Sequence, residues 1–221
     1  MVRKTAEKVP TRKVTEKIPD GVLQQDLEKY RQRAIEIGAT DAKIITTDMV
    51  VIDERVRAKC TYPKCTYYGT NINCPPHAME LEETRKLVSN FHYAIFIRQK
   101  LPTETLAGER TPQQYKQYLR DSKTQLDILA GVESEAFYDG YYFAVGYGGG
   151  PCKRFFCPND ECAALTPGQA CKYPLYARSC MEGEGMDAFL MATKVGWDIY
   201  PLGRSASPAP HGTRLSIVFI Y

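Results

Sequence analysis

The chain has 221 residues, of which 43% are hydrophobic and 25% are charged. This composition is typical of a soluble globular protein with one core of ordinary size. The formal net charge of only +3 indicates no general affinity for nucleic acid. No apolar run approaches the ~18 residues that span a bilayer, so we expect no membrane insertion. The N-terminus lacks the hydrophobic segment of a secretory signal, which predicts a cytoplasmic protein.

Predicted helices and strands alternate along most of the chain. Residues 1–19 show neither the periodicity of a helix nor that of a strand, and they are rich in Lys and Arg. This stretch is predicted to be a basic flexible tail. Apolar residues three and four positions apart predict helices at about 20–37, 79–91, 111–138 and 187–195. Short β-branched and aromatic runs predict strands at 42–45, 49–52, 93–97, 141–147, 197–200 and 215–221. We therefore expect a single α/β domain over 20–221, a mixed sheet with helices packed on its faces and two cysteine-rich metal-binding loop regions.

Local signals mark the ends of two of these helices. Asp20 is a candidate N-cap, and Gly38 fits the position just past the C-terminus of the same helix. Thr111 followed by Pro112 predicts the start of the long helix, with a possible break at Gly131. Its expected core-facing residues are Tyr115, Leu119, Leu126, Leu129 and Phe137, and those of the later helix are Phe189, Leu190 and Val195.

The eight cysteines fall into two groups that lie in polar stretches rich in Gly, Pro and Lys. Inert buried thiols would instead be scattered through apolar segments. Structural disulfides are rare in a reducing compartment. This pattern predicts metal binding, within an insert at about 148–181 and in an earlier loop. The first group is Cys60, Cys65 and Cys74, and the second is Cys152, Cys157, Cys162, Cys171 and Cys180.

The spacing favours iron–sulfur clusters over zinc. Three evenly spaced cysteines with a more distant fourth are typical of ferredoxins. Zinc knuckles usually have two to four intervening residues and come in pairs, so zinc remains an alternative. Two 4Fe–4S clusters would divide the cysteines into Cys152, Cys157, Cys162 and Cys171 for one and Cys60, Cys65 and Cys74 with Cys180 for the other. Without Cys180 as a ligand, one iron would be open to substrate.

Basic residues flank both groups. A cubane with four thiolates is anionic, so nearby cations stabilise it and raise its potential. The candidates for this role are Lys59, Lys64, Lys153 and Arg178, with Arg154 and Lys172 close by in the sequence.

These residues resemble an uncharacterised bacterial and archaeal family of predicted metal-binding (iron–sulfur) proteins. That family has three N-terminal cysteines ending in Cys-Pro-Pro, then a ferredoxin-like cysteine run and a segment containing Met-Glu. The chain departs from it in its wider Cys-x4-Cys spacing and in Cys180, where the family usually has Ser. The resemblance implies iron–sulfur binding and anaerobic metabolism. The departure at Cys180 predicts eight ligands where the usual member has seven. Its matching residues include Cys60, Cys65, Gly69, Cys74, Pro75, Pro76, Gly150, Cys152, Cys157, Cys162, Cys171, Arg178, Met181, Glu182 and Asp187.

The sequence thus predicts an iron–sulfur protein that transfers electrons as an accessory or small subunit of an anaerobic redox enzyme. Its partner would be a redox protein or a larger enzyme complex, and it could form a homo-oligomer. Two alternatives stay open at this stage. One is a reductase or lyase with an open iron at Cys60, Cys65 and Cys74, and the other is a zinc-stapled interaction module. A single 4Fe–4S cluster is also compatible with the pattern.

Overall fold

The computed structural model describes residues 10–203 and 209–221, and the first half of the predicted flexible tail lies outside them. A four-stranded sheet forms its centre, in the order β1 (Asp41–Thr46), β2 (Tyr93–Leu101), β4 (Gly212–Phe219) and β3 (Val145–Tyr147). All three ladders are antiparallel. Among the described residues, the one parallel pairing is the isolated bridge between Gly148 and Cys180. The predicted α/β class is confirmed, and the mixed character of the sheet is limited to that bridge.

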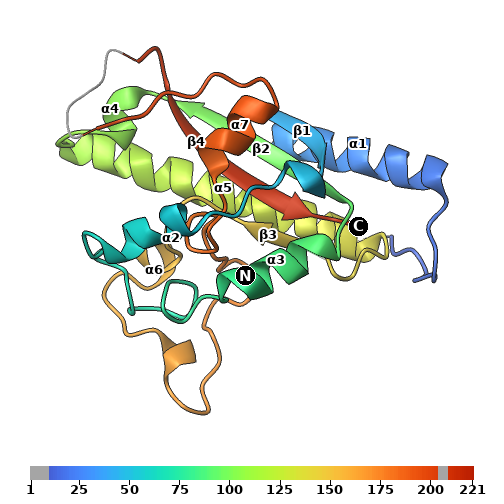
Figure 1. The fold of residues 1–221 in the computed structure, drawn as a ribbon, viewed down its shortest axis with the longest axis horizontal. Coiled ribbons are helices and arrows are strands. Elements are labelled where there is room, and N and C mark those ends of the chain that lie inside the picture. Colours follow the sequence, from blue (N-terminus) through green and yellow to red (C-terminus); the bar gives the residue numbers. More distant parts are fainter. Residues whose placement is uncertain (1–9, 204–208) are drawn as a thin grey trace, which may run out of the picture.

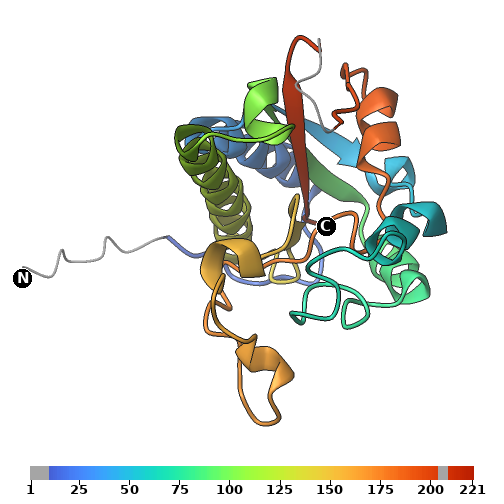
Figure 2. The same cartoon turned by 90° about the vertical axis from the view of Figure 1, so that its left-hand side faces the viewer.

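Helices cover both faces of this sheet (Figures 1 and 2). The long helices α1 (Asp20–Ile37) and α5 (Pro112–Tyr138) pack on one face. On the other side lie α2 (Glu54–Thr61), α3 (Leu81–Ser89) and α7 (Ala188–Lys194). Short turns complete the chain, namely η1 (Thr47–Met49), α4 (Thr103–Leu106), α6 (Lys153–Phe156) and η2 (Ala163–Leu165). None of the described helices is long and apolar enough to cross a membrane.

The central strands are apolar on both faces because each face is covered. In β2, Ile95 and Ile97 belong to the core beneath α1 and α5. Phe96, between them, points to the opposite core and stacks on Trp197 with ring centroids 5.0 Å apart. Side chains alternate across a strand, so one strand contributes to two cores.

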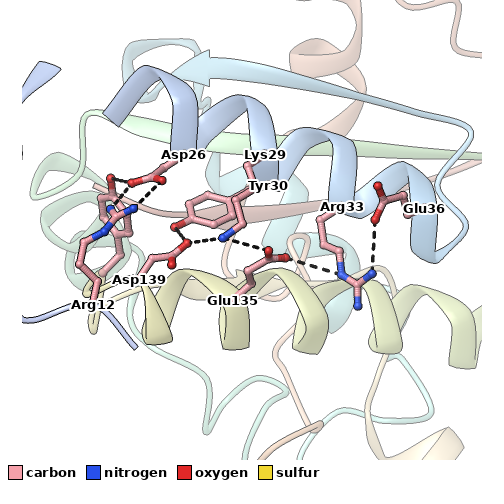
Figure 3. Close-up of polar contacts among 9 residues, drawn as sticks. Arg12, Asp26, Lys29, Tyr30, Arg33, Glu36, Glu135 and Asp139 are labelled. Atoms are coloured by element: carbon pink, nitrogen blue, oxygen red, sulfur yellow. Dashed lines mark hydrogen bonds and ion pairs between the residues drawn. The ribbon is translucent and has the colours of Figure 1, made fainter. Parts of the chain in front are cut away.

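Ion pairs and hydrogen bonds join α1, α5 and the N-terminal segment (Figure 3). Asp26 on α1 forms a bidentate pair with Arg12, which anchors residues before the first helix. Lys29 and Tyr30 both donate to Asp139 at the end of α5, over 2.7 and 2.8 Å. These contacts fix the relative position of the two helices through groups that are partly shielded from water.

Most predicted helix ends are confirmed, with two corrections. Asp20 is the first helical residue, and Pro19 occupies the N-cap without a side-chain hydrogen bond. Thr111 forms a capping box with Gln114, as its sequence suggests. The long helix α5 continues unbroken through Gly131. An added Cβ there would clash with Ile37 Cδ1, so this glycine allows α1 and α5 to approach closely.

Three predicted strands are wrong or shorter than expected. Residues 49–52 contain only a bridge from Ile52 to Met186, and residues 197–200 form no strand. Their apolar side chains, such as Trp197, pack into the core from loops. The predicted strand 141–147 is reduced to β3. Several expected core residues are in fact exposed, namely Tyr115, Phe137, Phe189 and Leu190, while Met191 and Ala192 of α7 are buried.

Candidate metal centre

Four cysteines of the second group line one narrow cavity. Cys152 precedes α6 and is buried, while the other three lie along a segment that projects from the body of the protein (Figure 2, orange). The cavity wall also includes Asn71 and Asn73, which come from the first cysteine group. The four cysteines that share this cavity are Cys152, Cys157, Cys162 and Cys171.

The segment that carries these cysteines begins and ends at the same place. The amide of Gly148 donates to Ser179 O over 2.9 Å, and the amide of Met181 donates to Gly148 O over 2.8 Å. These bonds place Cys180 beside the end of β3, while the four earlier cysteines lie in the loop between. The structure thus separates Cys180 from the rest of its sequence group.

The first group wraps around the C-terminus of α2. Cys60 lies in the last turn of that helix, and the amide of Cys65 donates to Cys60 O over 2.9 Å. The loop then closes through a 2.7 Å hydrogen bond from the amide of Gly69 to Pro75 O, next to the buried Cys74. All three cysteines were predicted to lie on loops, whereas Cys60 lies in a helix.

Cys180 is joined to this first group. Two backbone hydrogen bonds fasten the segment after Cys180 to the residues before α2, from Asp53 N to Gly185 O (2.9 Å) and from Asp187 N to Val51 O (2.8 Å). Gly185 has φ +75°, and a Cβ there would lie 2.5 Å from Leu81 Cδ2, so the close approach requires glycine. Cys180 therefore shares its surroundings with Cys60 and Cys74.

The charges that shift the pKa of each buried thiol include those of nearby cysteines, and for Cys74 one of these is Cys152 of the second group. Burial raises the pKa of the Cys180 thiol well above its ordinary value, and the charges of Cys74 and Cys60 raise it further. Burial likewise raises the pKa of Cys74 to about 11, and the charges of Cys152, Cys65 and Cys60 contribute. In the second set, burial raises the pKa of Cys152, with contributions from the charges of Cys162, Cys171 and Cys157. Thiolates bind metals, so binding at either set would release protons.

Two asparagines connect the two sets. Asn73 Nδ2 donates to Cys152 Sγ over 3.3 Å, and the Cys152 thiol faces Asn71 Oδ1 at 3.8 Å. A hydrogen bond with Asn71 also lowers the pKa of Cys74. Backbone amides bond to two further sulfurs, from Gly183 to Cys180 Sγ (3.2 Å) and from Tyr173 to Cys171 Sγ (3.3 Å). Neither asparagine was predicted as a site residue, although both are polar amides that lie between Cys65 and Cys74 in the sequence.

The four cations predicted to stabilise the clusters contact different groups in the structure. Arg178 forms a bidentate pair with Glu133 of α5, so a carboxylate already balances its charge. Lys153 donates to the carbonyl of Asp160 within the projecting segment, and Lys64 lies 5.3 Å from the Tyr68 ring centroid. Lys59 is in the last turn of α2, beside Cys60.

Two other cations act on the cysteines. The charge of Arg57 lowers the pKa of Cys60, against the larger effects of burial and Cys65. Lys172 similarly opposes the rise in the pKa of Cys157 that burial and the charges of Cys162 and Cys171 produce. Arg57 was not predicted to act on the cysteines, because it lies before the cysteine motif and its place in α2 was not expected.

An α/β domain with eight cysteines that form no disulfide, four of them lining one cavity, has the thiol donor groups of a metal-binding protein. The chain belongs to the family of predicted metal-binding proteins DUF2284, whose model matches residues 43–220. Comparison with curated proteins and with solved structures gives no match. Within the described ranges, no group of three or more His, Cys, Asp or Glu side chains is arranged to hold a single metal ion.

Proposed function

We propose that the protein binds two 4Fe–4S clusters and transfers electrons. The observation that carries this proposal is the arrangement of the cysteines: Cys152, Cys157, Cys162 and Cys171 line one cavity, and Cys180 lies near Cys74 and Cys60 of the other sequence group. In a cubane each thiolate binds a separate iron, so the ligands surround a volume instead of converging on one point. Four cysteines around a cavity suit that requirement.

The sulfurs have the hydrogen-bond donors that such clusters use. Amide donors to Cys152, Cys171 and Cys180 come from Asn73, Tyr173 and Gly183. Bonds of this kind delocalise thiolate charge and raise the reduction potential. When bound, the clusters would supply one-electron transfer, while the chain holds the sulfurs, excludes water from the buried ones and sets the potential.

The contact between the sets supports transfer from one to the other. Asn71 and Asn73 lie between Cys74 and Cys152 and contact the second of these. Three cysteines of the second set lie on a projecting segment, where a protein partner can reach them (Figure 2). We propose that electrons pass between the first set, at the domain, and a redox partner or larger enzyme complex at the second. This role belongs in a reducing, cytoplasmic setting, where thiolate ligands stay available.

Anaerobic purification with metal and sulfide counts tests the proposal. Two cubanes correspond to about eight irons and eight sulfides per chain. Electron paramagnetic resonance after dithionite reduction should then show two interacting reduced clusters. Stoichiometric zinc without charge-transfer absorbance would refute it and favour a zinc-stapled interaction module. Only half the iron, in a single non-interacting signal, would refute the second cluster.

A further inference from the structure

A cavity rich in arginine lies beside the first cysteine set. It has a volume of about 310 Å³ and lies among α5, α7 and β4. Arg110, Arg154 and Arg214 line it, and Glu182 is the one carboxylate in its described wall. Three guanidinium groups against one carboxylate give this hollow a net positive charge, whereas the whole chain is only slightly basic.

Arg214 is the residue that most strongly indicates a ligand site in this cavity. It lies on β4, its residue surface is only 7% exposed, and its buried Nη1 has no hydrogen-bond partner among the described residues. A buried charged donor without an acceptor raises the free energy of the folded protein by more than an ordinary surface contact lowers it. An anion in the cavity would supply the missing acceptor.

The other two arginines are held in place by neutral groups. Arg154 Nε donates to the Tyr67 hydroxyl over 3.0 Å, and Arg110 Nη2 donates to Leu106 O over 2.6 Å. All three guanidinium groups lie over the Tyr118 ring, between 4.7 and 5.4 Å from its centroid. The ion pairs of the described residues include none of the three.

The charges in the cavity are therefore only partly balanced. Burial lowers the pKa of Arg214, and the charges of Arg154 and Arg110 lower it further, against the opposite effects of Tyr118 and Asp121. Three like charges around one ring repel each other, and an anion among them would offset this repulsion. Tyr118 fixes them by cation–π contact, which supplies orientation but no negative charge.

The glycine run before Cys152 packs closely against β4. An added Cβ on Gly149 would lie 3.2 Å from Leu215 O and 3.3 Å from Arg214 Cγ. The Gly149 amide already donates to Gln125 Oε1 over 2.9 Å. The run therefore does not hold an anion through this amide, and the side chains of the arginines must do so.

We propose that this cavity binds a small molecule through a carboxylate or phosphate group held by Arg214, Arg154 and Arg110. Its volume is at the lower end of the ~300–1,000 Å³ of small-molecule sites, which limits the ligand to a small metabolite. Phe189 and Tyr200 in the wall would contact the remainder of the ligand. Glu182 lines the cavity two residues after Cys180, so the ligand would lie next to Cys180.

Equilibrium dialysis of the full chain with radiolabelled inorganic phosphate and radiolabelled succinate tests this binding. We expect saturable binding of at least one probe, weakened by added salt. Phosphate binding would identify a phosphorylated ligand, and succinate binding a carboxylic acid. Arg214→Gln should weaken the binding by about tenfold or more, the equivalent of one lost charged hydrogen bond. Arg120→Gln is the matched control, because it removes the same charge from an exposed position on α5.

A second pair of variants avoids the buried arginine. Phe189 and Leu190 are neighbours in the first turn of α7 and both are exposed, but only Phe189 lines the cavity. Phe189→Glu should repel the probe, and Leu190→Glu should leave it bound. Failure of both probes to bind saturably would overturn the proposal, as would equal losses in either pair of variants. Binding does not require metal, so the result is independent of the cluster proposal.

Discussion

Replacement of Cys180 by Ser is the most direct test of how the cysteines are divided. Cys180 is buried and its sulfur accepts a 3.2 Å hydrogen bond from the Gly183 amide. A serine oxygen is smaller and can accept the same bond, so the substitution should cost the fold only about 1 kcal/mol. The protein should therefore fold, and any change in metal content reports the ligand itself.

The expected magnitude follows from the two sets. Cys180→Ser removes one of four thiolates from the first set, so iron content should fall from about eight to about four per chain. Cys171→Ser removes one ligand from the second set and should produce the same loss, but of the other cluster. Because the charge of Cys152 acts on Cys74, the sets are close, and each variant should lose the spin coupling between the clusters.

Iron and sulfide counts with paramagnetic resonance measure both effects, and Ser89→Ala at an exposed position on α3 serves as a control. The double variant Cys171→Ser with Cys180→Ser should contain almost no iron. If Cys180→Ser keeps the iron content and spectrum of the wild type while Cys171→Ser loses half, Cys180 is not a required ligand. The first set would then have an open iron, which is the arrangement expected of a reductase or lyase.

Three further predictions concern a hydrogen bond to a cysteine, a close backbone approach and a buried carboxylate. Asn73→Ala removes a donor to Cys152 and should lower the potential of the second cluster by about 40 mV, roughly 1 kcal/mol, in a redox titration. Gly185→Ala should destabilise the protein by about 3 kcal/mol in urea, from a positive φ and a clash with Leu81, whereas Gly196→Ala, with open space, should cost about 1.5 kcal/mol; equal losses would contradict this. Burial alone would raise the pKa of Asp26, but hydrogen bonds from Arg12 and Tyr141 outweigh it and lower the pKa below 3.8. The stability that ionised Asp26 contributes is present above pH 3.8 and is lost as pH falls through its folded-state pKa. The free energy of unfolding of Asp26→Asn, measured in urea, should therefore fall less steeply with decreasing pH than that of the wild type. Equal slopes for the two proteins would refute this role.

Local patterns were sufficient for the two long helices and for the cysteine inventory, whereas the helix α2 that carries Cys60 was not predicted. Apolar periodicity predicted α1 and α5 almost to their ends, because a helix buries one face at a spacing set by its own geometry. The Thr111–Pro112 signal worked because capping involves only neighbouring backbone groups. The clustering of cysteines in polar segments likewise indicated metal binding, in agreement with the family to which the chain belongs.

Local patterns failed where a side chain's partner is distant in the chain. Trp197 and its neighbours resemble a strand, but they pack as a loop against Phe96 on β2. Phe189 and Leu190 resemble a buried helix face, yet the tertiary packing turns Met191 and Ala192 inward. Amphipathicity specifies that one face is buried, and the position of the neighbouring elements decides which one.

The cysteines show the same limit most clearly. Their number and spacing predict eight candidate ligands and a local set of four, which a single stretch of chain can supply. The surroundings of Cys180 depend on backbone bonds between residues 51–53 and 185–187, which no local pattern specifies. The arginine cavity likewise draws Arg110, Arg154 and Arg214 from three separate segments around Tyr118. Contacts between distant segments form only when the sheet and its helices assemble, so the tertiary structure alone brings these groups together.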